Sequence, residues 1–88
     1  MQLVNIGYGN MVAANRVIAV VSPDSAPVKR MVQDGRKAGR VVDATLGRKT
    51  QSVLVMDSGH IVLSAVQTSA IQGRLTGRES GSEEEEDT

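Results

Sequence analysis

The sequence contains no cysteine, phenylalanine or tryptophan, and only one tyrosine and one histidine among its 88 residues. Without cysteine, a disulfide framework, thiolate metal sites and cysteine nucleophiles are all excluded. A chain of this length forms one small domain. Because its core must consist almost entirely of aliphatic side chains, stability as a monomer is expected to be marginal, which predicts a homo-oligomer.

Long apolar runs are also missing. No run approaches the roughly 18 residues of a membrane span, and the N-terminal MQLVNIGYGN lacks the basic stretch, long apolar segment and cleavage site of a signal peptide. We therefore expect a soluble cytoplasmic protein with no membrane partner.

The charges are unevenly distributed, although the formal net charge is zero. All ten Lys and Arg residues lie within residues 1–78 beside four Asp residues, which gives 10 − 4 = +6, and residues 79–88 carry −6. The sequence thus predicts a basic folded domain, 1–77, followed by a disordered acidic tail, 78–88. Such a tail either solubilises the protein or competes with DNA for the basic face.

Hydrophobic patterns predict an α+β fold with a small antiparallel-rich sheet. RVIAVVS, 16–22, is nearly continuous in apolar character, which predicts a central strand covered on both faces. SPDSAPVKRMVQDGRKAG, 22–39, predicts the main helix, with Val28, Met31 and Val32 on its buried face. Further strands are expected from RVVDATL, TQSVLVM and HIVLSAV, joined by hairpin-like GRK and DSG connections, and TSAIQGRL, 68–75, predicts a short terminal helix.

Residues with the potential for catalysis are few. The GYGN stretch, 7–10, resembles the start of a dinucleotide-binding turn, but the strand-like run from Val17 leaves too little room for the required helix. We interpret it as a structural turn. His60 is the single histidine, and no base or second metal ligand lies near it in sequence. The sequence therefore favours a protein that is not an enzyme and has no cofactor or metal.

The basic residues are more informative as a group. Arg16 precedes the first long strand, and TLGRKTQ, 45–51, places Arg48 beside Lys49 on a glycine turn. Side chains of this kind neutralise phosphates. Since single-strand binding usually requires aromatic stacking platforms, double-stranded DNA is the better partner. A basic surface that is solvated and binds no partner is an interpretation of equal weight. To it we assign Arg36, Lys37, Arg40, Arg74 and Arg78.

The order of several short segments resembles the bacterial RemA family of extracellular matrix regulatory proteins. The segments that carry the resemblance are NIGYGN, ANR, SPDSAP, DATLGRKT and MDSGHIVLSA, and together they span nearly all of the chain before the tail. The resemblance implies a DNA-binding transcriptional regulator, an activator of biofilm matrix and osmoprotection genes. It also implies a ring-shaped homo-oligomer, for which an octamer is one option.

Carried over by these segments, the DNA-binding residues are Arg16, Arg48 and Lys49. The characterised relative has two arginines at the turn, so Lys49 departs from it. Lysine keeps the charge but loses the planar guanidinium that binds bidentately. Two alternatives stay open: an oligomeric protein-interaction scaffold, and a nucleotide or small-molecule sensor that uses the GYGN turn.

Overall fold

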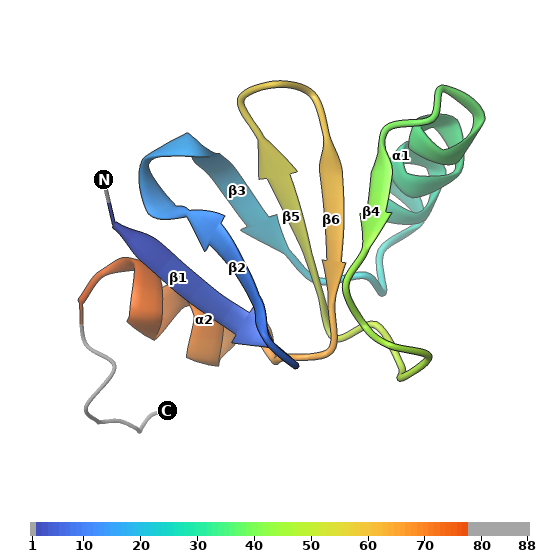
Figure 1. The fold of residues 1–88 in the computed structure, drawn as a ribbon. Coiled ribbons are helices and arrows are strands. Elements are labelled where there is room, and N and C mark those ends of the chain that lie inside the picture. Colours follow the sequence, from blue (N-terminus) through green and yellow to red (C-terminus); the bar gives the residue numbers. More distant parts are fainter. Residues whose placement is uncertain (1, 78–88) are drawn as a thin grey trace.

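The computed structural model describes residues 2–77, which form six strands, two α-helices and one turn of 3₁₀-helix (Figure 1). In chain order the elements are β1 (Leu3–Gly7), β2 (Asn10–Ala13), η1 (Ala14–Arg16), β3 (Val17–Val21), α1 (Ala26–Lys37), β4 (Val41–Asp43), β5 (Ser52–Met56), β6 (Ile61–Ser64) and α2 (Thr68–Leu75). The predicted α+β class, with one main helix and a short C-terminal helix, is confirmed. The predicted disordered tail, 78–88, lies outside the described residues.

Four strands form the central sheet in the order β3-β5-β6-β4. β5 pairs antiparallel with β3 and with β6, whereas β4 pairs parallel with β6. The sheet is therefore rich in antiparallel pairs, as predicted, but mixed. The DSG connection does join a hairpin, β5–β6. The expected hairpin through GRK is wrong, because residues 44–51 lead from β4 past the end of β6 to β5.

β3 lies at an edge of this sheet, so the prediction of a central strand over 16–22 is wrong. The register shifts between Val17 and Ala19, and the intervening Ile18 is 67% exposed. β-Branched residues favour edge and central strands alike, so composition did not separate the two cases. β5 and β6 occupy the central positions instead.

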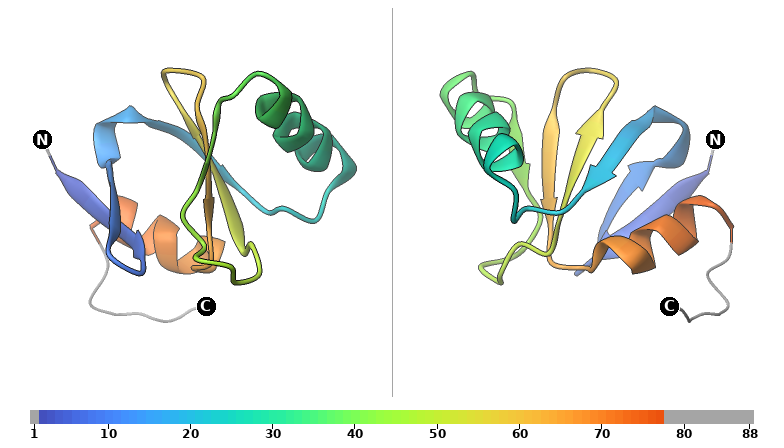
Figure 2. Two further views of the ribbon diagram at one scale, coloured as in Figure 1. Left: turned by 45° about the vertical axis from the view of Figure 1, so that its right-hand side comes forward. Right: turned by 180° about the vertical axis from the view of Figure 1, so that it is seen from behind.

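The two faces of the sheet are covered by different layers. Side chains alternate along a strand, so neighbouring residues of β5 and β6 face opposite sides. Toward α1 point Val53, Ile61 and Leu63, which pack with Val28, Met31, Val32 and Val41. The other face contributes Leu54 and Val62 to a core with Val4, Ile6, Val12 and Ile71. Figure 2 shows α1 on one side of the sheet, and the β1–β2 hairpin with α2 on the other.

α1 begins and packs as its sequence predicts. The Ser25 hydroxyl accepts a hydrogen bond from the Val28 amide at 3.3 Å, and Pro27 lies in the first turn. The helix packs closely on the sheet at Gly35, where an added Cβ would lie 3.1 Å from Cγ2 of Val41 and 3.3 Å from Cγ1 of Ile61. A side chain at this position would require these two neighbours to shift.

Two buried hydroxyls tie the sheet to the layer that carries β1. Ser64 donates a hydrogen bond to the Ile6 carbonyl, and Ser52 donates one to the Val66 carbonyl, each at 2.7 Å. Both serines are fully buried, so each bond satisfies a polar group that water does not reach. The Ser64 bond holds the end of β1 against the sheet, and the Ser52 bond fixes the segment between β6 and α2.

Candidate nucleic-acid interface

The three residues predicted to bind DNA lie at opposite ends of β5. Arg16 is the last residue of η1, and its carbonyl accepts a hydrogen bond from the amide of Asp57, the residue after β5. Arg48 and Lys49 belong to the loop that enters β5 at its other end. In Figure 1 this loop lies at the bottom of the sheet and the β5–β6 turn at the top. The domain therefore presents two separate basic turns, which we call the Arg48 turn (residues 44–51) and the Arg16 turn (residues 14–16 with 57–60).

The Arg48 turn is held in shape by its own hydrogen bonds. Asp43 accepts from both the amide and the hydroxyl of Thr45, at 2.9 and 2.6 Å, and the Arg48 amide donates to the Thr45 carbonyl at 3.1 Å. Leu46 and Gly47 follow with φ angles of +52° and +80°. Glycine adopts this left-handed conformation without strain, so Gly47 makes the turn, as predicted.

The carboxylate of Asp43 is stabilised in its charged form. Its hydrogen bonds from Thr45 lower its pKa below the ordinary value of 3.8, and the nearby positive charge of Arg36 adds to the effect. Asp43 therefore stays ionised near neutral pH, where it accepts both hydrogen bonds from Thr45.

The side chain of Arg48 packs on the face of the Tyr8 ring. The guanidinium carbon of Arg48 lies 4.0 Å from the centroid of the Tyr8 ring, a cation–π contact. Tyr8 belongs to the GYGN turn between β1 and β2, and its own φ angle is +54°. The GYGN stretch is thus a structural turn followed by a strand, which confirms that interpretation. It also places an aromatic ring under the predicted DNA contact.

The side chain of Asn10 fastens the GYGN turn to the Arg48 turn. Its amide nitrogen donates to the carbonyl of Gly7 at 3.0 Å and to the carbonyl of Ala44 at 3.3 Å. Ala44 opens the loop that carries Arg48. The GYGN turn and the Arg48 turn, which are far apart in the sequence, are therefore held together, and Arg48 is exposed to solvent.

The Arg16 turn has a different construction. Arg16 forms an exposed ion pair with Asp57 at 3.3 Å, with side chains 63% and 42% exposed. Such a pair contributes at most about 1 kcal/mol to stability. An anion that binds Arg16 more tightly than Asp57 does can therefore displace Asp57 at a small cost in free energy. Within residues 2–77 this is the single ion pair, so neither Arg48 nor Lys49 is paired with a carboxylate there.

Arg40 lies over the same turn. An added Cβ at Gly59 would be 2.7 Å from Nη1 of Arg40, so the guanidinium rests directly on this glycine. Two arginines therefore flank the β5–β6 turn, one beside Asp57 and the other on Gly59. The His60 ring in this turn is hydrogen bonded through Nδ1 to the Ser58 hydroxyl at 2.7 Å.

Sequence reasoning missed three of these contributions. These are the contacts of Tyr8 with Arg48, of Asn10 with Ala44, and of Arg40 with Gly59. Each acts through a contact with a segment distant in sequence, so no local pattern marked it. A partial signal existed in Gly59, since a glycine at a turn tip often marks a close approach.

Other kinds of site find little support. Among the side chains of residues 2–77, no three His, Asp or Glu gather in a way that would hold a metal ion. None of the helices in that part of the chain is long and apolar enough to cross a membrane. The features that stand out are the exposed arginines on two turns of a small α+β domain.

Comparison with known proteins gives the family. The chain belongs to the RemA-like family, whose description is "Extracellular matrix regulatory protein A-like" and whose sequence profile matches residues 3–75. It is similar to Extracellular matrix regulatory protein A of Bacillus subtilis (strain 168), with 56% identity over 79 residues that cover 90% of this chain and 89% of that one. A relative from Geobacillus kaustophilus, also named for a regulatory role, is 56% identical over 84 residues, 96% of this chain and 97% of its own. The resemblance that the sequence motifs indicated is confirmed.

Proposed function

We propose that this protein is a DNA-binding transcriptional regulator that contacts double-stranded DNA through Arg16, Arg48 and Lys49, repeated around a ring-shaped homo-oligomer. The observation that carries the proposal is the placement of Arg48, which is exposed on a braced loop and stacked on Tyr8. A guanidinium held in this way presents its outward donors to a phosphate or a guanine edge. The regulatory names of the relatives favour this role over an enzymatic one.

The two basic residues of the Arg48 turn are expected to differ in role. Arg48 is oriented by the Tyr8 ring and by a hydrogen bond from its Nη1 to the Leu46 carbonyl at 3.5 Å. Lys49 is exposed and has no hydrogen bond or ion pair to the rest of residues 2–77. A flexible ammonium serves as a phosphate contact and a fixed guanidinium suits base readout, so we assign sequence discrimination to Arg48.

The separation of the two basic turns supports an oligomeric site. Each lies at a different end of β5, so one protomer offers two small contacts that are weak alone. Repetition of both contacts in an oligomer raises the effective concentration of each after the first has bound. DNA that follows the oligomer would then meet these turns at regular intervals.

The surface of the domain is suited to self-association. The terminal strands of the sheet, β3 and β4, carry Ile18 and Val42, which are 67% and 49% exposed. Large apolar residues on open sheet edges mark interfaces or aggregation sites. Because the two edges differ, contact between β3 of one copy and β4 of the next is head-to-tail, and a head-to-tail contact that closes gives a ring.

The expected targets follow the family. The Bacillus subtilis relative is named for regulation of the extracellular matrix, and we propose activation of biofilm matrix and osmoprotection genes in the cytoplasm. The test is a mobility-shift series on genomic fragments at increasing salt, with the protein mass measured in the same buffers. A steep salt dependence with preference for certain fragments supports the proposal. Absence of binding at low salt would overturn it.

A further inference from the structure

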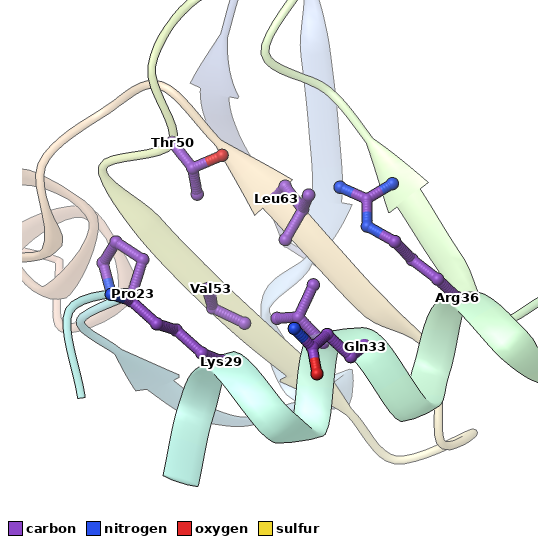
Figure 3. Close-up of a pocket in the computed structure, with 8 residues that line it drawn as sticks. Pro23, Lys29, Gln33, Arg36, Thr50, Val53 and Leu63 are labelled. Carbon is purple, nitrogen blue, oxygen red and sulfur yellow. The ribbon is translucent and has the colours of Figure 1, made fainter. Parts of the chain in front are cut away.

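A groove between α1 and the sheet is not used by the proposed DNA contacts. It has a volume of about 230 Å³ and lies between the helix and the start of β5. Figure 3 shows Lys29, Gln33 and Arg36 on the helix and Thr50 on the opposite side. This volume is slightly below the roughly 300 Å³ at which pockets for drug-sized ligands begin. The groove therefore suits a molecule smaller than a nucleotide.

One wall of the groove is a row of hydrogen-bond donors. Lys29, Gln33 and Arg36 have the i, i+4, i+7 spacing that places them along one side of α1. Seven residues correspond to a rise of about 10.5 Å along a helix. The backbones of Lys29 and Arg36 are thus about that far apart along the helix, with the Gln33 amide side chain between them. Within the described part of the chain, neither cation forms an ion pair.

The middle of the groove is apolar. Val53 and Leu63 close its bottom, with 0% and 3% of their surface exposed, so water does not reach them there. Pro23 and Val32 are only partly buried and are the apolar groups that a ligand would touch. Thr50 adds a hydroxyl on the far wall, from the same loop as Arg48 and Lys49.

We propose that this groove binds a small elongated dianion, with two acidic groups joined by a short apolar chain. Its acidic groups would pair with Lys29 and Arg36, and its apolar middle would lie on Pro23 and Val32. A row of phosphates would gain nothing from the apolar middle, and a neutral apolar ligand would gain nothing from the two cations. Two cations and an apolar stretch together therefore favour an elongated dianion over both of these ligands.

The probe is octanedioate, a linear dicarboxylate whose extended length is similar to the helix rise between Lys29 and Arg36. Saturation-transfer difference NMR on the full-length protein measures its binding, because this method tolerates a large oligomer and weak affinity. A ligand of this size is expected to have a Kd of roughly 0.1–1 mM. Octanoate keeps the chain with one charge, and butanedioate keeps both charges at a shorter spacing. Both are expected to bind at least about tenfold more weakly.

Two pairs of variants provide the matched comparison. Lys29→Gln and Arg36→Gln each remove one charge from the groove, whereas Arg30→Gln and Lys37→Gln remove one charge from other parts of the same helix. We expect the first pair to lose the octanedioate signal and the second pair to retain it. Equal signals from all four variants, or equal binding of octanoate and octanedioate, would overturn the proposal. DNA binding does not enter this test, so its outcome is independent of the proposed function.

Discussion

The guanidinium carbon of Arg48 lies 4.0 Å from the centre of the Tyr8 ring, although the two residues belong to turns that connect strands of different sheets. Asn10 holds these turns together through the Ala44 carbonyl. The GYGN and TLGRK stretches, which look unrelated in the sequence, therefore form one structural unit. Substitutions at Tyr8 and Arg48 should therefore affect DNA binding through the same contact.

Substitution of Tyr8 tests the support beneath Arg48. A cation–π contact at an exposed site contributes about 0.5–1 kcal/mol, which corresponds to roughly two- to fivefold in affinity. We expect Tyr8→Leu to weaken duplex binding by that factor and Tyr8→Phe to bind like the parent, as measured by fluorescence anisotropy. If Tyr8→Phe loses as much affinity as Tyr8→Leu, the hydroxyl and not the ring face is the important group.

Arg40 is expected to join Arg16 at the second basic turn. Its guanidinium lies on Gly59, beside the Asp57 that pairs with Arg16. Loss of one exposed hydrogen bond that contributes about 1 kcal/mol should lower duplex affinity roughly fivefold in Arg40→Ala. The slope of log affinity against log salt should also fall by about 0.9. Arg30→Ala, an equal change of charge on α1, is the control, and an equal loss in both variants would contradict the role of Arg40.

The stability contribution of Asp43 should depend on pH. Its pKa is lowered in the folded state by the hydrogen bonds from Thr45, so the ionised form stabilises the fold above 3.8 and this contribution is lost as pH falls through the lowered pKa. We expect Asp43→Asn to reduce the free energy of unfolding more at pH 6 than at pH 3. Urea unfolding at both values measures the difference. An effect of equal size at the two pH values would contradict this assignment.

The sheet edges give a prediction about assembly. Ile18→Glu places a charge on β3 and Val42→Glu places one on β4, so each variant keeps one intact edge in a head-to-tail contact. We expect each variant alone to be monomeric and an equimolar mixture to contain two-chain complexes, as measured by light scattering. Met11→Glu, at a 54% exposed position on the β1–β2 hairpin, is the control and should keep the parental mass. Parental mass in both edge variants would contradict an edge-to-edge interface.

Much of the fold could be predicted from local patterns, because those patterns have local causes. The helix expected within 22–39 is α1, and Ser25 caps it by accepting a hydrogen bond from the Val28 amide. The place of each strand in the sheet had no such signal: β3 was expected at the centre and lies at the edge. Strand order is set by contacts between distant segments, such as the parallel pairing of β4 with its neighbour β6.

In the candidate site, too, some features could be predicted from the sequence and others depend on contacts between distant segments. The charge distribution and the glycine turn indicated a basic surface, and the resemblance to the RemA family selected Arg16, Arg48 and Lys49 within it. Their separation at opposite ends of β5 follows from the sheet topology. The contacts of Tyr8 with Arg48 and of Arg40 with Gly59 also follow from the topology, because each joins two residues that lie far apart in the sequence.

The central claim is that the two basic turns bind duplex DNA, and fluorescence anisotropy across a salt series tests it most directly. The comparison uses Arg48→Ala, Arg16→Ala and the control Arg30→Ala, with the mass of each oligomer confirmed by light scattering. We predict that both turn variants lose at least about tenfold in affinity and have shallower salt slopes, while the control binds like the parent. Parental affinity and slope in Arg48→Ala and Arg16→Ala, with the oligomer intact, would contradict the account.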